Sequence, residues 1–427
     1  MTTSRNAITR RDSFRLAGAA AAAAATARAA DANPQAQPTA PAAGELNDDA
    51  DVLVVGGGTA GTIAAIQAAR AGAKTMLVER GSQLGGTMTV GGVAFPGLFH
   101  AWGKQIIAGI GWELVTETVA TDGGQLPDFQ AQKVPHWKHQ VQINPYVYAL
   151  LAEEKCLQAG VKIAYYEFPL SAEKSADGWS VRCVGPGTRR RIACRQIIDC
   201  TGGGDLAGMI GLERLREDET QPGSILYKVG DPYQPGREQL QALYVHGADS
   251  SNSVTRTQAN LTGRQAVLKR LREAPAKGGK PARLIHLQSE TAFRESYRVL
   301  GETVITHADY TAGRVYDDAV CYAFYPIDLH TRTGVKPKPL AKGVVPTVPL
   351  RALAPKTSRN ILVAGRCVSS DRLANSALRV QASCMAMGQA AGATAALAAK
   401  GKTTPLDVPL ADIHRTLREH KAIVPGA

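Results

Sequence analysis

The sequence lacks the features that mark several common classes of protein. Its seven cysteines include no Cys-x-x-Cys pair, which argues against a zinc finger or a thioredoxin-type redox site. The alanine-rich run that ends at Ala25 is too short and too weakly apolar to cross a bilayer. Basic residues are dispersed, apart from Arg189–Arg191. We therefore expect no metal site, no permanent membrane anchor and no nucleic-acid partner.

The overall composition is that of an ordinary globular protein. The 427 residues are 44% hydrophobic and 20% charged, which allows two or three domains around a large core. The first thirty residues supply +4 of the formal net charge of +12. The remaining excess is moderate, so we expect a solvated basic surface, with attraction of anionic substrates as the alternative.

A basic segment near the N-terminus has the form of a targeting sequence. Thr9–Leu16 reads TRRDSFRL and precedes the alanine run. It resembles a twin-arginine export signal, although Phe14 lies one place later than in the usual pattern. We predict a signal peptide at residues 1–30, a proline- and alanine-rich disordered linker at 31–48, and a periplasmic protein exported in the folded state. The alternative is a disordered basic tail.

The clearest motif is a strand, a glycine turn, a helix and a second strand between Asp51 and Arg80. Val52–Val55 is short and β-branched, as a buried parallel strand is. Gly56, Gly58 and Gly61 follow in GxGxxG spacing: the first permits the turn, the second lets the backbone approach a pyrophosphate, and the third allows close helix packing. This pattern predicts a nucleotide site, with a ligand-free glycine turn as the alternative.

An acidic residue suggests which nucleotide is bound. Glu79 ends the second strand 18 residues after Gly61, where its carboxylate can accept hydrogen bonds from the ribose hydroxyls of an adenosine. The same charge disfavours a 2′-phosphate, although Arg80 beside it weakens that exclusion. NAD and FAD remain. Because the sequence has no second GxGxxG unit, a dedicated NAD(P)H site is not expected.

Three further segments carry a family resemblance. Gly85, Gly86 and Thr87 follow the second strand; residues 197–208 read IIDCTGGGDLAG; and Gly365 and Arg366 precede a helix rich in small residues at Val380–Ala398. Together with the first glycine turn, they resemble the FAD-dependent oxidoreductases that have a glutathione-reductase-like FAD domain.

The resemblance implies an α/β fold with a Rossmann-like FAD/NAD(P)-binding domain, in which a parallel sheet, ββα layers and a small antiparallel meander combine with an inserted substrate or cap domain. The expected parts are FAD-binding segments at 49–204 and 346–400, the insertion at 205–345, and a tail at 401–427 whose helix Leu410–His420 packs or supports a homo-oligomer. The residues expected to contact FAD are Gly56, Gly58, Thr59, Ala60, Gly61, Glu79, Arg80, Gly85, Gly86, Thr87, Thr201, Gly202, Gly365, Arg366, Arg379, Val380 and Gln381.

Two stretches offer candidates for catalysis. A helix starting near Trp102–Ile106 and running to Val119 would bring His100 close to the active site. A helix over Ser289–Leu300 would place Arg294 and Arg298 on one face, where they can clamp a carboxylate or a phosphate.

A third stretch offers a proton acceptor. In YPIDLH, Asp328 and His330 alternate as on a strand and point to the same side. A histidine with an acidic partner can accept a substrate proton. The alternative for each candidate in these stretches is a structural role.

These features together predict an exported FAD-dependent oxidoreductase that transfers a hydride between flavin N5 and a small organic substrate, anionic or sugar-like. A quinone, a redox partner or oxygen would exchange electrons with it. Two alternatives remain: a flavin-dependent isomerase or lyase with no net redox change, and a nucleotide-binding protein without catalysis.

Overall fold

The computed structural model describes residues 44–426 apart from residues 132, 232–235, 237 and 277–282. The export signal predicted at residues 1–30 and the linker up to residue 43 lie outside the described residues. Within the described part, no helix combines the length and apolarity needed to cross a membrane. The same part contains no group of three or more His, Cys, Asp and Glu side chains placed to hold a metal ion.

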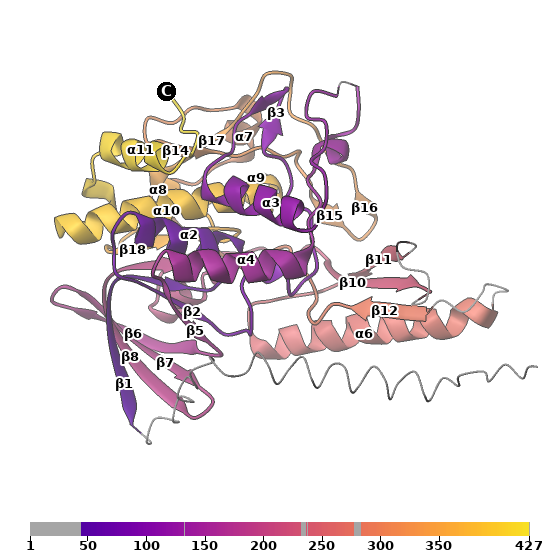
Figure 1. The fold of residues 1–427 in the computed structure, drawn as a ribbon, viewed down its shortest axis with the longest axis horizontal. Coiled ribbons are helices and arrows are strands. Elements are labelled where there is room, and N and C mark those ends of the chain that lie inside the picture. Colours follow the sequence, from indigo (N-terminus) through magenta and orange to yellow (C-terminus); the bar gives the residue numbers. More distant parts are fainter. Residues whose placement is uncertain (1–43, 132, 232–235, 237, 277–282, 427) are drawn as a thin grey trace, which may run out of the picture. The chain divides into compact units, whose positions relative to one another are not determined.

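A seven-stranded sheet forms the centre of the nucleotide fold (Figure 1). Its strands are β1 (Glu45–Val55), β2 (Thr75–Glu79), β5 (Lys162–Tyr165), β6 (Phe168–Ser175), β7 (Gly178–Gly185), β8 (Thr188–Asp199) and β18 (Ile361–Val363). The order is β5-β2-β1-β8-β7-β6, with β18 also on β8. The pairs among β5, β2, β1, β8 and β18 are parallel, whereas β6, β7 and β8 form an antiparallel meander. The predicted α/β fold is confirmed.

Alternate residues of β1 face two different cores, as the period of a strand requires. Val52 and Val54 belong to the large core that contains the helices α2 (Thr59–Arg70), α3 (Ile110–Thr121), α4 (Pro145–Gln158) and α10 (Gln381–Gly401). Leu53 and Val55 belong to a second core with Trp179 of the meander. The parallel sheet is therefore sandwiched between a helical layer and the meander.

The first strand begins earlier than predicted. The expected linker ended at residue 48, but Glu45–Asp48 already pair with β8, beginning with Glu45 opposite Arg189. Their acidic side chains meet the basic run on β8: Asp48 forms an ion pair with Arg190, and Glu45 lies 3.1 Å from Arg191. These long-range partners hold a polar stretch in a strand, and the linker prediction is corrected at this end.

The helix α10 packs closely on α2 because of two glycines. A Cβ atom at Gly388 would lie 2.2 Å from the carbonyl oxygen of Ala60, and one at Gly392 would lie 2.4 Å from that of Ala64. The small residues of α10 therefore bring the two helices into backbone contact. The predicted tail helix is confirmed as α11 (Leu410–Glu419), which buries Ile413. Its role in a homo-oligomer stays a prediction.

Part of the predicted insertion forms a lobe with its own core (Figure 1). It contains β10 (Gly223–Gly230), β11 (Gln239–Val245), β12 (Arg283–Leu287) and α6 (Ser253–Ala276), with strand order β11-β10-β12. By contrast, Ile305, Tyr310 and Phe324 pack in the large core of the nucleotide fold. The stretch 205–345 is thus divided between a separate lobe and the main body.

Short elements connect these parts. The strands are β3 (His100–Ala101), β4 (Lys104–Gln105), β9 (Arg214–Leu215), β13 (Arg298–Val299), β14 (Ala319–Tyr322), β15 (His330–Thr331), β16 (Gly334–Val335) and β17 (Thr347–Pro349). The helices are α5 (Asp205–Met209), α7 (His307–Ala312), α8 (Leu350–Leu353) and α9 (Arg372–Leu378), with 3₁₀ turns at Gly86–Met88, His136–His139 and Pro405–Asp407.

Two predicted helices differ from the structure. The helix expected from Trp102–Ile106 begins only at Ile110, because Trp102 and Gly109 have left-handed backbone, with φ of 54° and 83°. The helix expected over Ser289–Leu300 is absent, and this stretch has no regular structure apart from an isolated bridge at Ala292 and the short strand β13.

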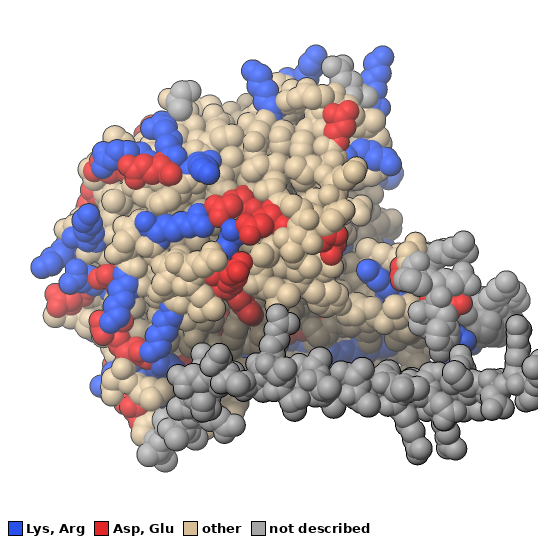
Figure 2. Space-filling model, viewed as in Figure 1, with Lys and Arg blue, Asp and Glu red and all other residues tan. Residues whose placement is uncertain are grey.

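Basic and acidic side chains are interspersed over the centre and left of the visible face of the molecule (Figure 2). Ion pairs connect the surface helices: Arg70 of α2 lies 2.9 Å from Glu113 of α3, and Lys155 of α4 also lies 2.9 Å from Glu113. Arg70 and Lys155 are thus neutralised locally by Glu113.

Candidate active site

The turn between β1 and α2 has the shape expected of a phosphate-binding loop. Gly56 has φ of 97°, and a Cβ atom at Gly61 would lie 1.8 Å from the carbonyl oxygen of Gly56. A Cβ atom at Gly58 would meet no atom within 4 Å, because this residue faces open space at the start of α2. The helix N-terminus therefore points its free amides at a space that can take an anion.

The carboxylate of Glu79, the last residue of β2, is held in place by two backbone amides. It accepts hydrogen bonds from the backbone amides of Gly57 (2.6 Å) and Gly81 (2.7 Å), one on each oxygen. Each carboxylate oxygen keeps a second lone pair for ribose hydroxyls. The neighbouring Arg80 points across the cavity to Glu290, 3.9 Å away on the loop after β12.

The second glycine pair lies directly beside the first loop. The amide of Gly85 donates to the carbonyl of Gly57 (2.8 Å), and Gly85 and Gly86 both have positive φ. This geometry brings Gly86 and Thr87 to the wall of the same cavity. The two glycine segments are thus neighbours, as the resemblance implies.

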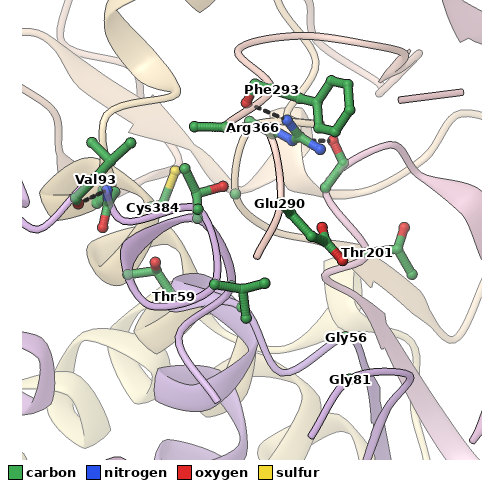
Figure 3. A pocket seen from close by; sticks show the side chains of 18 of the residues that line it. Gly56, Thr59, Gly81, Val93, Thr201, Glu290, Phe293, Arg366 and Cys384 are labelled. Carbon is green, nitrogen blue, oxygen red and sulfur yellow. Dashed lines mark hydrogen bonds between the residues drawn. The ribbon is translucent and has the colours of Figure 1, made fainter. Parts of the chain in front are cut away.

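Arg366 joins three segments around the cavity (Figure 3). Its Nε donates to the carbonyl of Gly202 (2.8 Å), one Nη donates to the carbonyl of Phe293 (2.6 Å), and the other lies 3.3 Å from the Ser250 hydroxyl. Phe293 and Ser250 belong to the region of the lobe, whereas Gly202 follows β8. Arg366 therefore holds the lobe against the nucleotide fold, a role that its place after a strand did not predict.

Replacing Arg366 by glutamine is expected to lower the free energy of unfolding by about 3 kcal/mol, because two carbonyls lose charge-assisted hydrogen bonds. Chemical denaturation measures this change. The matched control is Arg415→Gln, which breaks an exposed pair with Asp412 (2.8 Å) and should cost less than about 1 kcal/mol. Equal losses for the two variants would contradict the clamping role of Arg366.

The N-terminus of the 21-residue helix α10 forms another wall. Val380 is its N-cap, and the side-chain amide of Gln381 donates to the carbonyl of Val93 (2.8 Å). Within the described residues, Oε1 of Gln381 and Nε of Arg379 are buried without a hydrogen-bond partner. Unsatisfied buried polar atoms beside a cavity fit a polar ligand.

These segments surround one cavity of about 1000 Å³. Of the seventeen residues predicted to contact FAD, Gly61 and Gly85 shape the turns without lining it, and the other fifteen line it. Figure 3 shows part of the wall, with Gly56 and Thr59 across from Arg366 and Phe293. The open space at Gly58, the unsatisfied atoms at α10 and the volume of the cavity, whose wall includes both Glu79 and His330, fit a dinucleotide such as FAD.

The far end of the cavity holds a cluster of polar side chains around His330. Its Nδ1 lies 2.6 Å from the hydroxyl of Tyr244, and its Nε2 lies 3.1 Å from Oδ2 of Asp328. Arg379 donates to the same carboxylate oxygen (3.3 Å) and to the Asp328 carbonyl (3.1 Å). The predicted pair Asp328 and His330 is therefore brought together at the cavity wall.

The cluster also sets the protonation of its members. Burial would raise the pKa of Asp328, but the hydrogen bond from His330 and the charge of Arg379 outweigh it, and the pKa lies below its ordinary value. Burial lowers the pKa of His330, against the opposing effect of the Asp328 hydrogen bond. At neutral pH the carboxylate is ionised and the imidazole is neutral.

Arg294 lines this end, but Arg298 does not. Arg294 donates to the Pro222 carbonyl and to the Ser224 hydroxyl (3.1 Å), and burial and the charge of Arg379 lower its pKa to about 10, so it stays charged at neutral pH. Arg298 is buried elsewhere, where it contacts Glu217 (2.8 Å). The predicted Arg294–Arg298 clamp is wrong because the helix that would align them does not form. Arg379 is the second arginine of the cluster.

His100 is also outside the cavity. Its ring stacks on Phe129 at 3.8 Å between centroids, and Trp112 lies edge-on at 5.5 Å. Burial and the charge of His139 lower its pKa to about 4. The residue is not among those that line the cavity. The structure thus gives His100 a packing role, which corrects its prediction as a catalytic candidate.

Two residues of the cluster were missed by the sequence analysis. Tyr244 lies on β11, and Gln221 accepts a hydrogen bond from the backbone amide of His330 (3.0 Å) through Oε1. Neither belongs to a motif, and both are more than eighty residues from His330. Tyr244 lies between the apolar residues Leu243 and Val245 on an edge strand, and this local pattern does not identify its partner.

Comparison with known proteins identifies related sequences and folds. A family model described as FAD dependent oxidoreductase matches residues 51–222 and 223–417. The mitochondrial dihydrolipoyl dehydrogenase 2 of Arabidopsis thaliana is 45% identical over 56 residues, which are 13% of this chain and 11% of that enzyme. The match therefore spans about a ninth of that enzyme's length.

Solved structures show more distant similarity. A flavoprotein/dehydrogenase from Cytophaga hutchinsonii has a TM-score of 0.45 and 14% identity, covering 87% of this chain and 83% of its own. The anhydrotetracycline hydroxylase OxyS from Streptomyces rimosus has a TM-score of 0.43 and 13% identity, covering 87% of this chain and 66% of its own.

Proposed function

Because the chain belongs to the FAD-dependent oxidoreductase family, with FAD as its cofactor, we propose that it transfers a hydride between FAD and a small organic substrate, anionic or sugar-like. The observation that carries this proposal is the cluster of Asp328, His330, Arg294 and Arg379 at one end of the cavity. It lies beside the N-terminus of α10, because Arg379 directly precedes the N-cap Val380. A substrate at this end would contact both a cation and a proton acceptor.

The residues of the cavity would hold FAD in an extended form. Glu79 would accept hydrogen bonds from the ribose, and the N-terminus of α2 at Gly58 would face the pyrophosphate. The N-terminus of α10 at Val380 and Gln381 would favour negative charge on the bound group. When bound, FAD supplies the two-electron acceptor or donor that no side chain of the protein provides.

Two arginines would bind an anionic group of the substrate. Arg294 and Arg379 are both charged and both line the cavity, whereas Asp328 supplies a single negative charge among them. With His330 neutral, the cluster carries one excess positive charge. This surplus favours a substrate with one negative charge and orients it toward α10.

His330 and Asp328 would handle the proton. The neutral imidazole can take up a proton, and the ionised carboxylate of Asp328 would stabilise the resulting cation, as in other histidine-carboxylate pairs. Gln221 fixes the backbone of His330 from the side of the lobe.

The setting of the reaction is part of the same proposal. The Arg10-Arg11 pair supports export through the twin-arginine route, in which the enzyme would acquire FAD before it reaches the periplasm. The electrons would be exchanged there with a quinone, a redox protein or oxygen.

A visible spectrum of the purified protein tests this function first. We expect absorption near about 375 and 450 nm from bound oxidised flavin. Pools of hydroxy acids, sugar acids and amines are then added without oxygen, and one anionic pool is expected to bleach the 450 nm band. Turnover of a pool without bleaching or an electron acceptor would instead indicate an isomerase or lyase. A protein that retains no flavin after incubation with FAD would contradict the proposal.

A further inference from the structure

Both ring nitrogens of His330 already have partners, which limits what the ring can do. Nδ1 faces the hydroxyl of Tyr244 at 2.6 Å, and Nε2 faces Asp328 at 3.1 Å. The side chain of His330 is only 11% exposed. A substrate proton therefore has no free nitrogen to reach. The hydroxyl of Tyr244, which lines the cavity, can still accept a hydrogen bond while donating its own.

The charges around the ring fix the direction of these hydrogen bonds. Ionised Asp328 can only accept, so Nε2 of His330 carries the ring proton. Nδ1 of the neutral ring then has a lone pair, and the Tyr244 hydroxyl donates to it. The hydrogen-bonded chain is thus hydroxyl, imidazole and carboxylate, the order found in catalytic triads.

We propose that Tyr244 is the residue that exchanges a proton with the substrate, and that His330 and Asp328 act behind it. This inference rests on the proposed function. When an alcohol or amine loses a hydride to FAD, it also releases one proton from oxygen or nitrogen. That proton moves to the Tyr244 oxygen as the Tyr244 hydroxyl proton moves to Nδ1 of His330. The ring becomes a cation paired with Asp328, and reduction of a substrate reverses both transfers.

Arg294 supports this role of Tyr244. Its guanidinium lies over the Tyr244 ring, with Cζ 5.3 Å from the ring centroid. A cation at this position favours the negative charge that develops on the phenol oxygen during proton transfer. The titratable and charged groups that face Tyr244 and His330 are Asp328, Arg294, Arg379, His246, Glu219, Arg332 and Arg372.

A second, smaller cavity lies beside His330. It has a volume of about 50 Å³, and His330 lines both it and the large cavity. Glu219 and His246 also line it. Since a water molecule needs about 10–15 Å³ of such space, this cavity has room for water next to His330.

Replacing Tyr244 by phenylalanine removes only the hydroxyl and tests the relay. With the anionic substrate that bleaches the wild-type flavin, we expect the bleaching rate to fall about 100-fold, with unchanged FAD content. The matched control is Tyr146→Phe, which breaks another tyrosine–histidine hydrogen bond, to His286 (2.8 Å), outside the cavity. A Tyr244→Phe rate within twofold of wild type would overturn the relay, whereas a wild-type flavin that no pool bleaches would overturn the proposed function instead.

The protonation of His330 gives a readout that needs no substrate. In holoenzyme with ¹⁵N-labelled histidine, NMR at pH 7.5 should show the His330 proton on Nε2. In Tyr244→Phe the ring should become protonated at higher pH, because its neutral form has lost a hydrogen-bond donor. A proton on Nδ1 in the wild type, or an unchanged titration in the variant, would overturn the relay.

Discussion

Replacing His330 by asparagine is expected to slow the bleaching of bound flavin by substrate about 100-fold to 10,000-fold. Asparagine keeps a polar group near Asp328 but cannot take up a proton, so the step that removes the substrate proton loses its acceptor. The matched control is His286→Asn, because His286 also contacts a tyrosine hydroxyl but lies outside the cavity. Anaerobic stopped-flow measurement of the 450 nm band gives both rates.

The pH dependence of the wild type should identify the same group. Burial holds the pKa of His330 below the ordinary value of 6.5, so the ring is neutral above pH 6.5 and becomes protonated only at lower pH. The bleaching rate in the direction of substrate oxidation should therefore be constant above pH 6.5 and fall as the pH drops through the lowered pKa. His330→Asn should lack this acid limb. A variant that keeps both the rate and the limb would show that another group takes the proton.

Two glycine substitutions in one turn should separate folding from FAD binding. In Gly61→Ala the new Cβ atom would lie 1.8 Å from the Gly56 carbonyl oxygen, and the turn must open. We expect the free energy of unfolding to fall by about 3 kcal/mol, with loss of FAD. In Gly58→Ala the new Cβ atom meets no protein atom within 4 Å, so the apoprotein should be as stable as the wild type.

Gly58→Ala is expected to change the affinity for FAD without changing the stability of the apoprotein. The Cβ atom of Gly58→Ala would occupy the space where a pyrophosphate approaches α2, and the dissociation constant for FAD should rise roughly tenfold or more, as for one lost hydrogen bond to a charged group. Urea denaturation of the apoproteins and fluorescence titration with FAD measure the two quantities. If Gly58→Ala binds FAD normally, the nucleotide does not lie against this turn.

The parts of the site that could be predicted from sequence are those whose geometry is set locally. Gly56 needs positive φ, and Gly61 must lack a Cβ atom because the helix starts against the strand. These requirements involve residues that are close in sequence, so the spacing of the glycines in the sequence is enough to predict the turn. Asp328 and His330 were found for the same reason, since two residues apart on an extended segment share a side.

The errors arise where distant partners decide the conformation. Residues 289–300 have a helix-like pattern, but Glu295 binds Arg372 (2.9 Å) and Arg298 binds Glu217 (2.8 Å), and with these distant partners the segment forms no helix. The polar start of β1 is likewise held by arginines of β8. Tyr244 belongs to the lobe, and it contacts His330 only in the folded protein. The residues next to Tyr244 in the sequence give no sign of this contact.

The residues that line the cavity come from early and late parts of the sequence. The cavity can therefore form only late during synthesis of the chain. Val55 lies at the end of β1 and Cys384 lies in α10, so the ribosome must make nearly the whole protein before the cavity closes. The pairing of β1 with β8 and of β8 with β18 also joins early segments to late ones. A chain that ends before α10 therefore has no complete pocket. Bound FAD would report that the chain has been made at least as far as α10, which is the kind of information that the proposed export of a folded protein would need.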